Sequence, residues 1–225
     1  MKNIRIHCCL IVFALSPLCT KSQGFVNLDF EHPILPFNPV NFHVPISSAL
    51  PGWVGYYASV SFGTNIVSQI LYNAVSTGAA AISLHDTFDQ EDLPIAGEYS
   101  VFLQSSSPSG QYSSSIGQTG QIPVNTQSLT FLVRPTYLLQ VSFGGQIIPL
   151  FVIGTMGGND ILGGDISAFA GQTGELLFTA PYLGGGMIDN IQFSSSPVPE
   201  PSPFALSVLA FSALGGLLSA RYRRS

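Results

Sequence analysis

Histidines and acidic residues are the side chains of the central region that could carry acid–base chemistry. Residues 25–196 contain His32, His43 and His85, and Asp86 directly follows His85. A carboxylate can orient an imidazole as a base, but neighbouring residues of a strand point to opposite faces. The chain also lacks the Gly-x-Ser-x-Gly elbow, the His-Glu-x-x-His zinc motif and the P-loop. These patterns predict that the protein is not an enzyme.

Two other segments have a composition that could bind a metal. Asp86, Asp89, Glu91 and Asp92 lie close together, but their spacing is not that of an EF-hand, and such acids usually face solvent in a polar loop. Residues 157–165 are similar to a calcium-binding nonapeptide repeat. A β-roll needs several stacked copies, and the chain has one, so we expect a flexible glycine-rich loop there.

The charge distribution excludes one class of partner. Residues 25–196 contain a single basic residue, Arg134, and eleven of the twelve acids, which gives a net charge of −10 (one minus eleven). Binding to nucleic acid requires lysines and arginines that displace condensed counterions. We therefore expect no nucleic acid partner. The three cysteines, Cys8, Cys9 and Cys19, all precede this region.

The N-terminal segment has the pattern of a signal peptide. Lys2 and Arg5 precede an apolar run over residues 8–18. This run is too short to cross a bilayer but fits the apolar region of a signal peptide, and small residues follow it. We therefore predict a signal peptide over residues 1–24 and an exported protein.

The C-terminal segment combines a short motif, an apolar stretch and a basic cluster. Residues 197–225 contain Pro199-Glu200-Pro201, an uncharged stretch over about 204–220, and Arg221, Arg223 and Arg224. The stretch is just long enough for one transmembrane helix, and the arginines would stay on the cytoplasmic side. A simple membrane anchor would look similar.

This order of features resembles the PEP-CTERM sorting tail. The resemblance implies recognition of Pro199-Glu200-Pro201 by an exosortase, a membrane protease-transpeptidase, at the inner membrane. The two prolines keep the motif extended, as a protease cleft requires. Proteins with this tail are thought to belong to the cell surface or the matrix, so extracellular polysaccharide is a further expected partner. The expected location is the membrane before processing, and afterwards the envelope or the medium.

The region between the two tails predicts an all-β domain over residues 25–196. Short β-rich runs alternate with Gly, Pro, Ser and Asn clusters, which favours a β-sandwich or jelly roll. A helix is expected near residues 66–75, a paired hairpin around Arg134-Pro135, and a tight turn at Gly144-Gly145. The serine-rich segment 105–115 is expected to form a long loop. The expected strands cover residues 25–31, 79–84, 97–104, 127–133, 137–143, 146–153, 175–179 and 187–193.

Several short motifs resemble those of galactose-binding-like jelly rolls. They are Leu-Asp-Phe-Glu at residues 28–31, Pro-Gly-Trp at 51–53, the segment 165–173, and Ile-Asp-Asn-Ile-Gln-Phe at 188–193. In such modules an acid of the first strand and an acid of the last strand often share a structural calcium ion. The resemblance therefore implies that Glu31 and Asp189 bind calcium, with backbone oxygens as further ligands. The alternative is that both acids cap turns or face solvent.

Aromatic residues could provide a glycan-binding surface. Trp53, Tyr56 and Tyr57 form a dense group beside a turn, where rings could stack on sugars, although Trp53 could equally fill the core. We predict from the sequence an exported surface or matrix protein with a structural or adhesive role. The alternative prediction is a carbohydrate-binding module without catalysis.

Overall fold

The domain is an all-β sandwich. The computed structural model describes residues 24–36, 42–59, 61, 63–89, 92–106, 112–134 and 138–198. These residues form fourteen strands in two sheets, with one short α-helix, α1 (Ile46–Ala49), and one 3₁₀ turn, Ser167–Phe169. The prediction of an all-β sandwich is confirmed.

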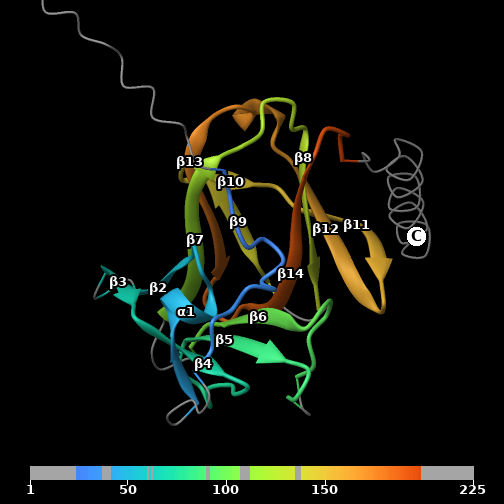
Figure 1. Cartoon of the computed structure of the whole chain (residues 1–225). Helices are drawn as coiled ribbons and strands as arrows, with labels where there is room; N and C mark the ends of the chain where they lie inside the picture. The colour runs from blue at the N-terminus through green and yellow to red at the C-terminus, as the bar shows by residue number, and fades with distance from the viewer. Residues whose placement is uncertain are drawn as a thin grey trace, which may run out of the picture.

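The larger sheet has eight strands and is antiparallel apart from its β4–β5 pair. Figure 1 shows β4, β5 and β6 together at one end of the domain, with β11 and β12 as a projecting hairpin. In order across the sheet, the strands are β1 (His43–Pro45), β4 (Gln69–Tyr72), β5 (Ala81–Asp86), β6 (Tyr99–Gln104), β14 (Gly185–Ser194), β8 (Ser128–Val133), β12 (Asn159–Asp165) and β11 (Phe151–Met156).

The smaller sheet has six antiparallel strands and packs face to face with the larger one. Its longest strands lie in the middle, where alternate side chains can reach the space between the sheets. In order, its strands are β10 (Gln146–Ile148), β9 (Gln140–Phe143), β13 (Thr173–Ala180), β7 (Tyr112–Gln121), β2 (Val54–Ser59) and β3 (Gly63–Val67).

Aromatic rings form the centre of the core between the sheets. The Trp53 ring lies 5.6 Å from Phe30 and 6.1 Å from Phe178, measured between ring centroids. Phe178 in turn meets Phe131 edge-on at 5.2 Å. Each large ring removes much apolar surface from water, so this cluster joins β13 of one sheet to β8 of the other.

The strands β5, β6 and β14 present a second, outward face. Val101, Leu103 and Ile188 are fully buried in the core. Because successive side chains of a strand alternate between faces, Phe102 and Met187 project to the opposite side of this sheet. We call this surface the outer face of β5–β6–β14, and it carries the candidate site.

Several local predictions are wrong. Residues 66–75 contain no helix. Gly63–Val67 forms β3, which pairs with β2 of the smaller sheet, and Gln69–Tyr72 forms β4, which pairs with β1 of the larger sheet. Residues 25–31 form turns and a coil rather than a strand, with positive φ at Asn27 and Phe30. Residues 127–133 and 137–143 do not pair, since β8 and β9 lie in different sheets.

Two segments expected to be loops contain strands. Asn159–Asp165 is strand β12, and the turn before it uses Gly157 and Gly158 at positive φ. The serine-rich segment runs into the ten-residue strand β7. Serine is compatible with a strand whose neighbours on both sides supply hydrogen bonds, as β2 and β13 do here.

The tight turn at Gly144-Gly145 is confirmed. Both glycines have positive φ, and β9 and β10 pair directly across them. Residues 1–23 of the predicted signal peptide and the predicted helix near 204–220 lie outside the described residues. Among the residues that the structure does describe, none belongs to a helix of the length and apolarity needed to cross a membrane.

Candidate functional site

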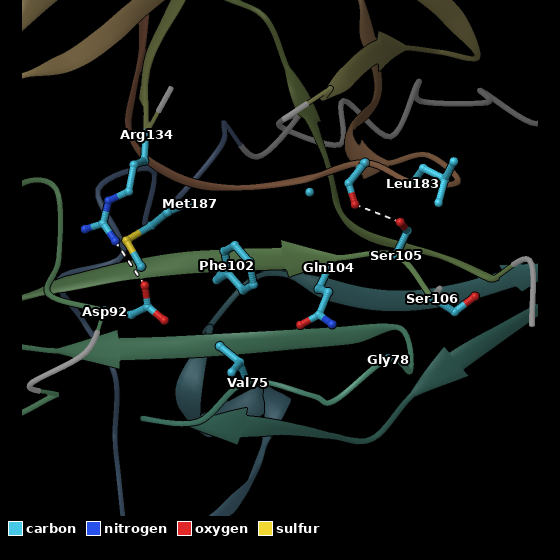
Figure 2. Close-up of a pocket in the computed structure, with 12 residues that line it drawn as sticks. Val75, Gly78, Asp92, Phe102, Gln104, Ser105, Ser106, Arg134, Leu183 and Met187 are labelled. Atoms are coloured by element: carbon cyan, nitrogen blue, oxygen red, sulfur yellow. Dashed lines mark hydrogen bonds and ion pairs between the residues drawn. The ribbon is translucent and has the colours of Figure 1, made fainter. Parts of the chain in front are cut away.

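A cavity of about 550 Å³ opens on the outer face of β5–β6–β14. Strands β6 and β14 provide its floor, and five connecting segments provide its rim. Figure 2 shows Arg134 and Asp92 at one end of the cavity and Ser105, Ser106 and Leu183 at the other. Its lining consists of Val75, Gly78, Asp92, Phe102, Gln104, Ser105, Ser106, Arg134, Leu183, Gly184, Gly185 and Met187.

Arg134 gives one end of the cavity a positive charge. Its Nη1 lies 3.2 Å from Oδ1 of Asp92, its Nη2 donates to the carbonyl of Leu93, and its backbone amide donates to the carbonyl of Met187 at 3.1 Å. Both partners of the ion pair are about one-third exposed, 34% for Arg134 and 37% for Asp92. The guanidinium therefore stays accessible to a ligand, and a guanidinium binds carboxylate oxygens through two parallel hydrogen bonds.

Apolar side chains form much of the remaining wall. Phe102 and Met187 project from neighbouring strands, while Val75 and Leu183 form part of the rim and are 44% and 60% exposed. At the other end, the Ser105 hydroxyl donates to the carbonyl of Gly184 at 2.7 Å. A cavity of this volume and lining is typical of sites for small organic molecules.

Glu31 lies near enough to Asp189 for its charge to act on that carboxyl group, while the calcium binding that the resemblance implied stays a prediction. Both oxygens of Glu31 accept the backbone amide of Glu98, at 2.9 and 3.1 Å, and one also accepts that of Tyr99. Gly97 makes this possible, because it has positive φ and a Cβ there would lie 2.0 Å from Glu31 Oε1. Glu31 thus holds the turn that leads into β6.

Asp189 is almost fully buried, with only 1% of its surface exposed. The Ser100 hydroxyl donates to its Oδ2 and the Asn190 amide to its Oδ1, both at 2.6 Å. Burial raises the pKa of Asp189 to about 7, and the charge of Glu31 adds to this rise against the opposing hydrogen bonds. The carboxyl group is therefore poised between its neutral and charged forms near neutral pH.

The chemistry of this pair fits a hard cation. The charge of Glu31 raises the pKa of Asp189, and no basic side chain of the described residues forms an ion pair with either of them. Calcium takes six to eight oxygen ligands, so backbone oxygens would have to complete the shell. Among the described residues, no group of three or more His, Cys, Asp or Glu side chains gathers in a metal-binding arrangement.

The acids of the loop after β5 each contact a different partner. Asp86 accepts hydrogen bonds from the Tyr72 hydroxyl and from Asn73 Nδ2, the latter at 2.7 Å. Asp92 pairs with Arg134, and Asp89 pairs with His85. The acids therefore do not converge on one point, and Glu91 lies outside the described residues.

His85 forms a buried pair with Asp89 rather than with its neighbour in sequence. His85 Nδ1 lies 2.7 Å from Oδ2 of Asp89, and the His85 side chain is fully buried. The chain turns back after β5 so that residue 89 lies over the outer face, whereas Asp86 points elsewhere. The orienting carboxylate is thus four residues away from the histidine, at a distance that strand alternation does not reveal.

The three aromatic residues considered for glycan contact do not form one exposed surface. Trp53 is 3% exposed, lies in the core and donates its Nε1 hydrogen to the carbonyl of Asn27 at 2.9 Å. Tyr56 and Tyr57 point to opposite faces of β2. Tyr57 packs against the core, while the Tyr56 hydroxyl donates to Glu175 at 2.8 Å.

The structure therefore places a cavity at a position that no local sequence motif predicted. Its lining comes from separate segments between residues 75 and 187, so no local motif marks it. One signal was present in the sequence, because Arg134 is the single basic residue of residues 25–196. The predicted sorting residues Pro199, Glu200, Pro201, Arg221, Arg223 and Arg224 lie outside the described residues.

Comparison with known proteins gives structural matches alone. No family model and no curated protein matches the chain. An apo cyclase from Fischerella sp. is 15% identical, with 76% of this chain and 94% of that one covered and a TM-score of 0.46. A Stig cyclase from Fischerella sp. TAU, in complex with a 3H-indole compound, is 14% identical, with 79% and 98% covered and a TM-score of 0.48.

The names of these similar structures do not agree with three predictions from the sequence. The structures are named as cyclases, whereas the sequence predicted a structural or adhesive protein without enzymatic activity. We therefore withdraw the structural or adhesive role, the non-catalytic carbohydrate-binding alternative and the prediction that the protein is not an enzyme. The identity and TM-scores are too low to transfer the substrate or the reaction of those proteins.

Proposed function

We propose that the domain binds a small organic molecule in the cavity on the outer face of β5–β6–β14. The ligand class is a compound with an apolar, ring-sized body and an anionic oxygen group. The observation that carries this proposal is the position of Arg134. The single basic side chain of residues 25–196 lies at the end of a cavity whose walls include Phe102 and Met187.

The electrostatics of the domain make that position informative. A body with a net charge of −10 repels anions in general, so one accessible guanidinium creates a local exception. Asp92 occupies part of the guanidinium at 3.2 Å in this structure. An incoming carboxylate would compete with Asp92 for Arg134, while its apolar body would cover Phe102.

A titration with 2-naphthoate tests the proposal, because this probe combines two fused rings with one carboxylate. Replacing Arg134→Gln removes a charge-assisted hydrogen bond and should weaken binding about ten- to hundredfold. Replacing Asp92→Asn removes the competing carboxylate and should tighten binding. Isothermal titration of the intact chain in lipid nanodiscs, with empty nanodiscs as the blank, measures both changes.

Tyr56→Phe is the matched control, because Tyr56 lies in the other sheet and pairs with Glu175. It should leave the affinity for 2-naphthoate unchanged. Equal affinities for wild type, Arg134→Gln and Asp92→Asn would contradict the proposal. Mass spectrometry of the probe recovered from the same samples shows whether it leaves the protein chemically unchanged.

For the finer classification of the fold, we propose a galactose-binding-like jelly roll with a calcium ion held by Glu31 and Asp189. The short motifs at residues 28–31 and 188–193 support this proposal, as does the effect of the Glu31 charge on the pKa of Asp189. The ion would neutralise two carboxylates and tie the segment around Glu31 to strand β14. Melting curves with calcium and with a chelator test it.

For the two tails, we propose export by the N-terminal segment and sorting through Pro199-Glu200-Pro201 by an exosortase at the inner membrane. The support is the sequence alone: an apolar run after Lys2 and Arg5, and an uncharged stretch before the terminal arginines. The intact mass of the protein from envelope and medium is the test. A mass that includes residues 204–225 would contradict processing of the tail.

A further inference from the structure

Three buried polar atoms lack a hydrogen-bond partner among the residues that the structure describes. They are Ser83 Oγ, His85 Nε2 and Ser114 Oγ. Buried polar groups in folded proteins are nearly always satisfied by protein, water or ligand, so each such atom needs an explanation. Two of the three, Ser83 and His85, lie two residues apart on β5 and therefore share one face of the sheet.

That shared face is the one that carries the cavity. In the β5–β6 ladder, Ser83 lies directly opposite Phe102, and His85 lies opposite Ser100. The His85 and Phe102 rings meet edge-on, with centroids 6.0 Å apart and an interplanar angle of 88°. Phe102 thus contacts His85 on one side and lines the cavity on the other.

The pair with Asp89 determines what His85 can bind. An ionised carboxylate accepts hydrogen bonds but cannot donate one, so Nδ1 of His85 carries the proton toward Asp89. In a neutral imidazole the other nitrogen, Nε2, is then an acceptor. Ser83 Oγ can accept or donate. Together, the two atoms suit a group that donates a hydrogen bond, such as a hydroxyl or an N–H.

We propose that Ser83 and His85 form a polar subsite behind Phe102. A movement of the Phe102 side chain joins this subsite to the cavity. The subsite takes a hydroxyl or N–H group of the ligand. This inference rests on the proposed function, because it extends the same cavity. It adds a second recognition element to the ligand: an anionic group at the Arg134 end and a hydrogen-bond donor at the β5 side.

The experiment replaces the benzyl side chain of Phe102 by a small molecule. Phe102→Ala should open a space of similar size, into which phenol can place its hydroxyl near Ser83 and His85 and toluene can place only a methyl group. We expect Phe102→Ala to favour phenol over toluene, relative to wild type. Adding Ser83→Ala should reduce this preference about tenfold, the value of one hydrogen bond.

Ser114→Ala in the Phe102→Ala background is the matched control, because Ser114 Oγ is equally buried and unpartnered but lies on β7. It should leave the preference unchanged. In ¹⁵N-histidine-labelled protein, phenol should shift the Nε2 resonance of His85. Binding is measured by equilibrium dialysis of the intact chain in nanodiscs against empty nanodiscs.

An equal preference in Phe102→Ala with and without Ser83→Ala, or an unshifted Nε2 resonance, would overturn the subsite. Either result is expected if water alone fills the space beside Ser83 and His85. The proposed function has a separate readout, because 2-naphthoate binding depends on Arg134 in wild-type protein. A retained dependence on Arg134 with no response of His85 would reject the subsite and leave the cavity proposal standing.

Discussion

The outer faces of the two sheets differ in how far their polar groups are buried. On the six-stranded sheet, Tyr56 pairs with Glu175, and Ser115 pairs with Thr179 at 2.9 Å, and both hydrogen bonds are only partly buried. On the eight-stranded sheet, the loop after β5 covers the polar groups. His85 and Asp189 there are almost completely buried, and each carries or faces a charge.

This difference in burial changes how much each polar pair contributes to the free energy of unfolding. Exposed polar pairs can exchange their partners for water at small cost, whereas burial of an ionisable group is costly unless it is paired. The covered face also has the cavity and two unpartnered polar atoms among the described residues. Perturbed ionisable groups beside a cavity are typical of functional sites. The eight-stranded sheet is thus the face on which we expect ligand chemistry.

The largest expected effect comes from the buried pair of His85 and Asp89. His85→Leu removes the imidazole that contacts the Asp89 carboxylate and should lower the free energy of unfolding by about 3–5 kcal/mol. Tyr56→Phe, which breaks a polar pair on the other face, should cost about 1 kcal/mol. Urea denaturation measures both. Similar losses in the two variants would remove the contrast between the faces.

The pH dependence of Asp189 should be nearly as large. Its pKa of about 7 lies above the ordinary 3.8, so the folded protein keeps a proton that the unfolded chain releases. The resulting stabilisation is complete at acid pH and is lost as the pH rises to about 7, by up to about 4 kcal/mol. Asp189→Asn keeps the neutral form, so its stability relative to wild type should rise over this range and then level off.

Parallel unfolding curves for wild type and Asp189→Asn across the pH range measure this difference. Because the other acids are common to both proteins, their contributions cancel in the comparison. A difference that does not vary with pH would show that the Asp189 carboxyl is not held neutral by burial.

Calcium should have a smaller effect at neutral pH. If Glu31 and Asp189 bind the ion, millimolar calcium should stabilise the domain by about 2–3 kcal/mol for a concentration near a hundred times Kd. Glu31→Gln should abolish this gain. A melting temperature that is the same with calcium and with chelator would leave the proton as the group that neutralises Asp189.

The smallest effect on stability is expected for Asp92→Asn. The Arg134–Asp92 pair is about one-third exposed at both partners, and such pairs contribute between zero and about 1 kcal/mol. The same substitution should nevertheless tighten 2-naphthoate binding. A stability loss well above this range would mean that the pair is a structural element of the loop rather than part of a binding site.

The sequence could predict the class of fold because local patterns encode it. Short β-rich runs predicted β5, β6, β8, β9, β10, β11, β13 and β14 but missed β1, β2, β3, β4, β7 and β12. Gly144-Gly145 predicted its hairpin, since both positions require positive φ. The prediction of a helix near residues 66–75 was wrong because the spacing of Ile66 and Ile70 fits both the helical and the strand periodicity. Pairing with β2 and β1 decided between them, and such pairing is not a local property.

The site could be predicted only in part. The resemblance of short motifs linked Glu31 to Asp189, which lies 158 positions further along the sequence (189 minus 31), and the charge of Glu31 does act on Asp189. Calcium binding by the pair stays a prediction. Predicting the cavity requires the order of the strands, because β14 lies between β6 and β8 and thereby brings Met187 next to Phe102. Predicting the His85–Asp89 pair requires the path of the loop after β5. Neither arrangement leaves a spacing rule in the sequence.

Methionine methyl groups offer the most direct test of the cavity as a binding site. The chain has three methionines, of which Met187 lines the cavity and Met156 lies exposed on β11. In ¹³C-methyl-methionine-labelled protein, 2-naphthoate should shift the Met187 resonance saturably and leave that of Met156 in place, and Arg134→Gln should weaken the response. A Met187 resonance that does not move while the probe binds would contradict the central claim.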